Sequence, residues 1–159
     1  MKNVLIILCL MVLLVSCATA QKDLFRDAKI IKADDSIIVS EKDLAQLKER
    51  VNEYWGYRIQ NNYTKAFDYE DPKTKQTYKI DLEEYLVSKS SLKYHSIRIE
   101  EVNFIRNEYA KVKIMVKYTF DFFEPVTDEK DITDKWVKRE DGEWYRIFTT
   151  NIGQAPLEN

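Results

Sequence analysis

The sequence predicts an α+β fold in which three N-terminal helices pack in the concave face of a curved, mostly antiparallel sheet. A change of hydrophobic period along the chain carries this prediction. From Ser40 to about Ser91 apolar side chains recur at steps of three and four, the period of a helix, and from Tyr94 onward they alternate with polar ones, as in a strand. Helices and strands that each have one apolar face bury these faces together most simply when the sheet curls around the helices.

The longest predicted helix runs from Ser40 to about Gln60. Ser40 and Asp43 have the spacing of a capping box, in which the two side chains satisfy free amide groups of the first turn. The Asn61-Asn62 pair ends the helix. The residues expected on its buried stripe are Leu44, Leu47, Val51, Tyr54, Trp55 and Arg58.

Two shorter helices are predicted before the strands begin. Asn62 can cap the first, which Asp71-Pro72 ends, and Asp81 with Glu84 has capping-box spacing at the start of the second. Between them, residues 75–80 alternate weakly and predict a short edge strand. The residues expected to point inward from the two helices are Tyr63, Ala66, Phe67, Leu82, Tyr85 and Leu86.

The strand region predicts a four-stranded antiparallel meander. Residues 110–122 alternate without a break and form the clearest strand of the chain. The apolar residues before this strand share one face only if a residue is inserted, which predicts a bulge at Glu100-Glu101. Ile132 and Trp136 mark the third strand, and Asp141-Gly142 is a two-residue hairpin signal that leads into the fourth.

This order of elements resembles the nuclear transport factor 2-like superfamily, a cone-shaped α+β fold shared with ketosteroid isomerase and scytalone dehydratase. The stretches that carry the resemblance are "RVNEYWGYRIQNNYTKAFDYEDP", "YAKVKIMVKYTF" and "DKWVKREDGEWYRI". The resemblance implies a sheet wrapped around helices, packed shut at its narrow end and with room for a pocket at its wide end. It implies a fold more than a function, because enzymes, carriers and interaction modules share this scaffold.

Aromatic and polar side chains are the candidates for lining such a pocket. For Tyr54 and Tyr118 the simpler interpretation is a core ring with a satisfied hydroxyl, and for Arg58 it is a side chain that covers an aromatic ring at the rim. No catalytic set of the family is matched, so no catalytic residue is assigned, and Asp68 is the nearby carboxylate that an enzyme could use. The candidate pocket residues are Tyr54, Tyr57, Arg58, Tyr63, Phe67, Tyr69, Tyr118 and Trp136.

The amino terminus predicts a bacterial lipoprotein. Lys2 precedes an apolar run from Val4 to Val15, which is too short for a membrane span and is typical of a signal peptide. Leu14-Val15-Ser16-Cys17 resembles the lipobox, which implies cleavage before Cys17 and lipidation of its thiol. The alternative is cleavage before Gln21, which would release a soluble secreted or periplasmic protein.

The expected organisation follows from these segments. It comprises a signal peptide over residues 1–16, a lipidated tether with a short extended segment over 17–40, the nuclear transport factor 2-like domain over 41–150 and a tail over 151–159. The sequence contains two cysteines, and because Cys9 lies in the signal peptide, the mature chain has no internal disulfide.

Composition limits the partners. The chain has 25 basic and 27 acidic residues, so its charge gives no case for nucleic acid binding. The acidic residues near the second hairpin lack calcium-loop spacing and are interpreted as a solvated hairpin end, so neither a metal site nor a cofactor is predicted. This group comprises Asp121, Glu124, Asp128, Glu129, Asp131 and Asp134.

These observations favour a lipid-anchored envelope protein with a non-catalytic cone domain. Its expected partners are the membrane, through Cys17, and either a small apolar ligand or another envelope protein. Ala18 in place of an aspartate after the cysteine resembles the sorting pattern for an outer membrane. The alternatives are a small enzyme of the isomerase, dehydratase or hydrolase type that uses a pocket tyrosine or aspartate, and a structural accessory subunit.

Overall fold

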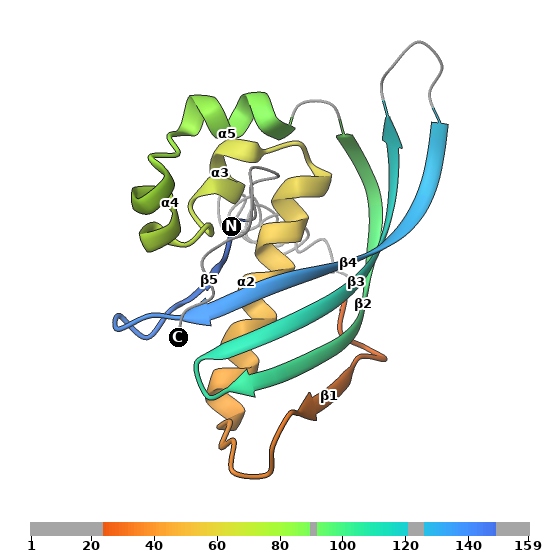
Figure 1. The fold of residues 1–159 in the computed structure, drawn as a ribbon. Helices are drawn as coiled ribbons and strands as arrows, with labels where there is room; N and C mark the ends of the chain where they lie inside the picture. Colours follow the sequence, from red (N-terminus) through yellow and green to blue (C-terminus); the bar gives the residue numbers. More distant parts are fainter. Residues whose placement is uncertain (1–23, 90–91, 121–125, 149–159) are drawn as a thin grey trace, which may run out of the picture.

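The computed structural model describes residues 24–89, 92–120 and 126–148 of the 159-residue chain, and these form a five-stranded sheet with four helices (Figure 1). Cys17 and the segments predicted as signal peptide and C-terminal tail lie outside the described residues. In chain order the elements are β1 (Lys29–Lys32), α2 (Glu41–Ile59), α3 (Tyr63–Phe67), α4 (Pro72–Tyr78), α5 (Leu82–Lys89), β2 (Leu92–Arg106), β3 (Tyr109–Phe120), β4 (Val126–Lys138) and β5 (Trp144–Arg146).

The sheet is a meander with one added edge strand. Its spatial order is β1-β2-β3-β4-β5, with β1 parallel to β2 and every other pair antiparallel. The predicted α+β class and the mostly antiparallel sheet are therefore confirmed. The short extended segment expected before the domain is β1, which pairs Lys29 with Glu101 and Lys32 with Phe104.

Bulges in β2 bend the sheet around α2. The register between β2 and β3 shifts between Ile99 and Glu101, which confirms the bulge predicted at Glu100-Glu101. Two further shifts lie between Tyr94 and Ser96 and between Phe104 and Arg106. Because each extra residue kinks its strand and increases the local twist, the long strands curve, and α2 lies along their concave face (Figure 1).

Helix α2 begins as the sequence predicts and buries five of the six residues of the predicted stripe, while Leu44 is partly buried. The backbone N–H of Asp43 donates to the Ser40 hydroxyl at 3.0 Å, and that hydroxyl donates to the Asp43 carboxylate at 2.8 Å. The buried residues of the helix are Leu47, Val51, Tyr54, Trp55 and Arg58. Opposite them, Trp136 of β4 and Trp144 of β5 are fully buried, so large rings from both layers form the centre of the core.

The edge strand predicted over residues 75–80 is wrong, because residues 75–78 belong to α4 and Lys79 is its C-cap. Asp71 is its N-cap and accepts a hydrogen bond from the Thr74 N–H at 2.9 Å. Pro72 occupies the first helical position, where its fixed φ suits a helix and its missing N–H costs nothing. Asp71-Pro72 was expected to end the preceding helix, but α3 already ends at Phe67, and Asp71-Pro72 starts α4 instead. A helix cap outweighs a weak alternation of polar residues.

Helices α3, α4 and α5 gather at the C-terminal end of α2 (Figure 1). They enclose a second hydrophobic cluster, called here the end cluster, which joins the helices to the residues after β5. Its buried members are Ile80, Tyr85 and Phe148, with Tyr63, Phe67 and Tyr78 packed against them.

The predicted hairpin signal lies in a longer loop than expected. Lys138 pairs with Trp144, so residues 139–143 connect β4 to β5. The Gly142 N–H donates to the Arg139 carbonyl at 2.8 Å, and Gly142 has a φ of 83°, a left-handed conformation that glycine adopts without strain.

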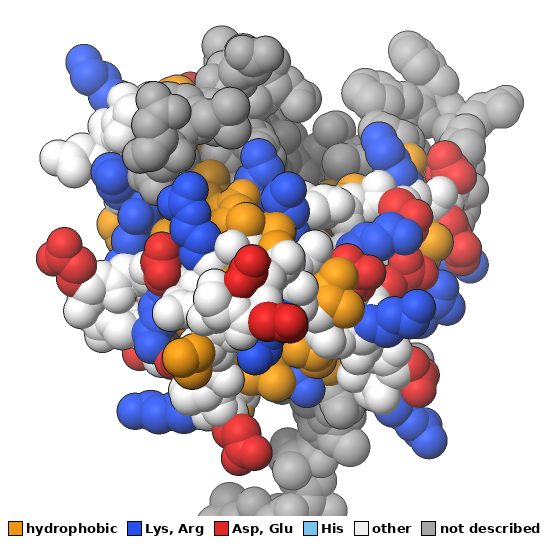
Figure 2. Space-filling view, turned by 60° about the horizontal axis from the view of Figure 1, so that its bottom comes forward, with side chains coloured by type: hydrophobic (Ala, Val, Ile, Leu, Met, Phe, Trp, Pro, Cys, Tyr) orange, Lys and Arg blue, Asp and Glu red, His pale blue; other side chains and the backbone are white. Residues whose placement is uncertain are grey.

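The end of the molecule at the bottom of Figure 1 exposes apolar side chains among charges. It carries β1, whose Ile30 and Ile31 are 40% and 38% exposed, and the loop before α2, where Ile38 is 77% exposed. Seen from this end, basic and acidic side chains are interspersed with the apolar ones (Figure 2). This face therefore presents charges of both signs and no uniform field.

We expect Trp136→Ala to lower the free energy of unfolding by about 3 to 5 kcal/mol, because the ring is fully buried and its removal leaves a cavity. Trp136→Phe should lose less, since it keeps a ring beside Tyr54, which packs edge-on against Trp136 with centroids 5.9 Å apart. Denaturant titration measures both losses, and an unchanged midpoint for Trp136→Ala would place the ring outside the core.

Candidate functional site

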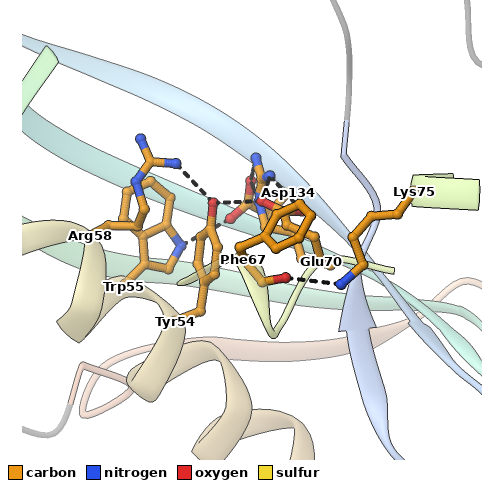
Figure 3. Close-up of polar contacts among 8 residues, drawn as sticks. Tyr54, Trp55, Arg58, Phe67, Glu70, Lys75 and Asp134 are labelled. Atoms are coloured by element: carbon orange, nitrogen blue, oxygen red, sulfur yellow. Dashed lines mark hydrogen bonds and ion pairs between the residues drawn. The ribbon is translucent and has the colours of Figure 1, made fainter. Parts of the chain in front are cut away.

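Charged and polar side chains meet inside the molecule where the C-terminal half of α2 faces β4 and β5. Figure 3 shows them converging between the helix and the sheet. Glu70 is fully buried, Arg58 is 2% exposed and Asp134 is 3% exposed, so the group is enclosed by the core. We call this group the interior polar cluster, and its members are Tyr54, Trp55, Arg58, Glu70, Asp134 and Arg146.

Arg146 bridges the two carboxylates of the cluster. Its Nη1 donates to Glu70 Oε1 at 3.0 Å, and its Nε and Nη2 lie 2.9 and 2.8 Å from Asp134 Oδ1. Burial by itself would lower the pKa of Arg146, but the carboxylates of Asp134 and Glu70 hold this pKa well above its ordinary value. Arg146 is therefore a permanent cation between two buried acids.

Two residues of α2 complete the hydrogen bonds of these acids. The Trp55 indole N–H donates to Asp134 Oδ2 at 2.9 Å, and the Tyr54 hydroxyl donates to Glu70 Oε1 at 3.2 Å. Burial raises the pKa of Tyr54 well above its ordinary value, so this hydroxyl keeps its proton. In this arrangement Tyr54 acts as a hydrogen-bond donor to Glu70 and does not serve as a base.

Arg58 makes few polar contacts for a buried guanidinium. Its Nη1 donates to the Tyr54 hydroxyl at 3.0 Å, and its Nε is buried with no acceptor among the residues that the structure describes. No carboxylate of those residues lies within ion-pair distance of its guanidinium. Tyr63 and Tyr94 flank it, with ring centroids 5.2 and 5.0 Å from Cζ. The expectation that Arg58 lies against an aromatic ring is therefore confirmed, but its expected place at the rim is wrong, because the side chain is buried.

A second ion pair fixes the chain beside the cluster. Arg139 binds Asp71 with two parallel hydrogen bonds, Nε to Oδ1 and Nη2 to Oδ2, both 2.8 Å long. The backbone of this segment also pairs with β5, since the Asp71 N–H donates to the Arg146 carbonyl and the Arg146 N–H to the Tyr69 carbonyl, both at 2.8 Å. The hydrogen bonds of Tyr69 and Asp71 with the Arg146 backbone therefore fix the position of Glu70, which lies between them, against Arg146.

Four of the expected pocket residues lie in or beside the core. Tyr54 and Arg58 belong to the interior polar cluster, and Trp136 packs against Tyr54. Tyr118 is buried on β3, where its hydroxyl is 3.4 Å from Asp128 Oδ2. The structure thus brings Tyr54, Arg58 and Trp136 together and leaves Tyr118 on a separate part of the sheet.

The other four expected residues lie around α3. The rings of Tyr57 and Tyr69 are 5.8 Å apart, and the Tyr69 hydroxyl donates to Glu53 at 2.8 Å. Tyr63 and Phe67 pack against the end cluster, and the carbonyl of Phe67 accepts a hydrogen bond from the Lys75 ammonium at 3.0 Å (Figure 3).

Sequence reasoning missed Glu70, Asp134 and Arg146. Asp134 was assigned to a solvated hairpin end, which is wrong, because it accepts hydrogen bonds from Trp55 and Arg146 inside the core. The available signal was its place in β4 midway between Ile132 and Trp136, both expected to face inward. Arg146 likewise lies midway between the buried Trp144 and Phe148. Asp68, the carboxylate considered for an enzyme, is exposed, and Glu70 two residues later is buried.

Comparisons with known proteins show similarity of fold alone. No family model matches the sequence, and no curated protein does. The structure is similar to the solution structure of a SEC-C motif-containing protein from Rhodopseudomonas palustris, with a TM-score of 0.52 and 10% identity over 65% of this chain and 77% of that chain. A crystal structure of a proposed ketosteroid isomerase from Shewanella frigidimarina aligns with a TM-score of 0.43 and 11% identity over 73% of this chain and 94% of that chain.

Removing the central cation should cost more than removing an exposed one. Arg146→Met leaves Glu70 and Asp134 buried without their cation, so we expect the free energy of unfolding to fall by about 3 to 5 kcal/mol in denaturant titration. The control is Lys113→Met, because Lys113 also joins two carboxylates but its side chain is 44% exposed. We expect that control to lose less than about 1 kcal/mol, and equal losses would contradict the role assigned to Arg146.

The Asp71–Arg139 pair should make stability depend on pH in acid. Burial by itself would raise the pKa of Asp71, but hydrogen bonds from Arg139 and Thr74 hold it below its ordinary value. A group whose pKa is lowered by folding stabilises the folded state fully above its unfolded pKa, about 3.9, and that contribution is lost as pH falls through the folded pKa. We therefore expect the free energy of unfolding to fall less steeply below about pH 4 in Asp71→Asn than in the natural protein, and parallel pH profiles would contradict this assignment.

Proposed function

We propose that this chain is an exported, lipid-anchored envelope protein whose domain acts by binding and not by catalysis. The proposal that the domain does not catalyse a reaction rests on one observation: the buried carboxylates are already bound to arginines. Glu70 and Asp134 accept hydrogen bonds from Arg146, and Asp71 accepts two from Arg139. A general base must be free to take a proton from a substrate within hydrogen-bond reach. Carboxylates already paired with arginines are suited to holding the fold together.

The alternative is a small enzyme of the isomerase, dehydratase or hydrolase type. Its best pair of residues would be Tyr54 and Glu70, which share a hydrogen bond. Two observations weigh against this role. The Glu70 carboxylate already accepts a hydrogen bond from Arg146, and the Tyr54 hydroxyl already donates to Glu70 and accepts from Arg58. We therefore favour a binding function for the domain, with a small apolar ligand or another envelope protein as its partner.

The anchor rests on the sequence around Cys17. Leu14-Val15-Ser16-Cys17 ends an apolar run, and a diacylated cysteine at the new amino terminus would hold the chain on a bilayer. Where the cell has an outer membrane, we propose that membrane as the site of the anchor, because Ala18 follows the cysteine. Residues 18–23 span about 20 Å when fully extended, so the domain would stay next to the lipid surface. No helix in the described part of the chain is long and apolar enough to cross a membrane.

Cys17→Ser tests the anchor. We expect the natural protein to fractionate with membranes and to carry a diacylglycerol on its first residue by mass spectrometry, and the variant to lose both properties because the thiol is the acceptor. Cys9→Ser is the matched control, since Cys9 lies within the apolar run that is removed, and it should leave both properties unchanged. An unmodified amino terminus at Gln21 would establish the soluble alternative.

A further inference from the structure

Arg58 is a buried cation whose hydrogen-bonding capacity is largely unused. It lies in the last turn of α2 and is 2% exposed. A guanidinium has five N–H donors, and burying a charged group without partners is costly. Among the described residues one acceptor is present, the Tyr54 hydroxyl at 3.0 Å from Nη1, while Nε is buried without one.

The charge of the cluster explains only part of this arrangement. Arg146 contacts the carboxylates of Glu70 and Asp134, and the positive charge of Arg58 brings the formal charge of the cluster to zero. The Tyr54 hydroxyl connects Arg58 to Glu70. Charge balance gives no reason for a donor to remain unsatisfied in the core. Arg146 shows the contrast, because its Nε, Nη1 and Nη2 all contact carboxylate oxygens.

The neighbours of Arg58 are aromatic. Its Cζ lies 5.2 Å from the Tyr63 ring centroid, 5.0 Å from that of Tyr94 and 6.0 Å from that of Trp55. Tyr63 begins α3 and Tyr94 lies near the start of β2, and both rings are partly exposed. Solvent therefore reaches the two rings that flank the guanidinium, while Arg58 itself lies beneath them.

We propose that Arg58 binds the carboxylate of a small ligand with an apolar body. Nη1 is engaged by Tyr54, which leaves the edge formed by Nε and Nη2, and this planar pair of donors matches the two oxygens of a carboxylate. The rings of Tyr63 and Tyr94 would enclose the apolar body, and entry would proceed between them. This inference rests on the proposed binding function and names the ligand class for it.

Hexanoate and hexanamide form a matched pair of probes, because they share an apolar chain and differ in the carboxylate. The experiment uses the lipid-anchored, full-length processed protein in lipid nanodiscs and measures the melting temperature against probe concentration. We expect hexanoate to raise the melting temperature in a saturable way and hexanamide to bind at least tenfold more weakly, since a ligand of the folded state stabilises it by mass action.

Variants then assign the effect to Arg58. We expect Arg58→Gln to weaken hexanoate binding at least tenfold, and Arg58→Lys to weaken it as well, because lysine keeps the charge and loses the paired donors. Arg98→Gln is the control, since the Arg98 side chain on β2 is 65% exposed, and it should bind hexanoate as the natural protein does.

Four outcomes would overturn the inference. These are no binding of either probe, equal affinity for hexanoate and hexanamide, undiminished hexanoate binding by Arg58→Gln, and displacement of hexanoate by inorganic phosphate at equal concentration. If Arg58→Gln does not fold, the two probes still decide the question on the natural protein. A negative result with both probes would remove the carboxylate site and leave the anchor at Cys17 to its own test.

Discussion

The guanidinium of Arg146 determines how three separate parts of the chain meet. It binds Glu70 from the segment after α3 and Asp134 from β4, while its own backbone pairs with residues 69–71. Helix α2 is connected to the same acids through Trp55 and Tyr54. Because hydrogen bonds are directional, these contacts fix the rotation of the helix on the sheet, which apolar packing alone would leave less defined.

The stability of this arrangement comes mainly from the rings around it. Trp55, Trp136 and Trp144 are almost completely buried, and each removes a large apolar surface from water. Buried ion pairs add little net stability, since desolvation offsets most of their attraction. The buried rings therefore provide most of the stability, and the buried charges determine how the helix and the sheet are oriented relative to each other. Arg58 fits neither group, because it is buried and mostly unpaired.

The sequence predicted the elements better than the site. The cap at Ser40, the stripe of α2 and the bulge at Glu100-Glu101 follow from local spacing, and local spacing is what determines them. The segment 75–80 failed because a weak alternation was preferred to the Asp71-Pro72 cap. Asp134 and Arg146 each lie two residues from a buried aromatic residue of the same segment, so alternation places their side chains on the inward face. The interpretation of Asp134 as solvated rests on its residue type alone, and Arg146 has no predicted role. The ion pair between Asp134 on β4 and Arg146 on β5 depends on how these two strands pair, which the local sequence does not determine.

The amino-terminal segment has a mechanical consequence. Phe25 and Ile37 are buried in the core on either side of β1, whose four residues are all exposed and which lies at the edge of the sheet. Among the described residues, tension applied from the amino-terminal side would meet the Leu24 carbonyl, which accepts a hydrogen bond from the Ile99 N–H, and the buried ring of Phe25. The hydrogen bonds between β1 and β2 and then Ile37 would follow before the tension reached α2. Under force, the contacts of β1 and its flanking residues would therefore break one after another while α2 and the sheet around Arg146 stay folded.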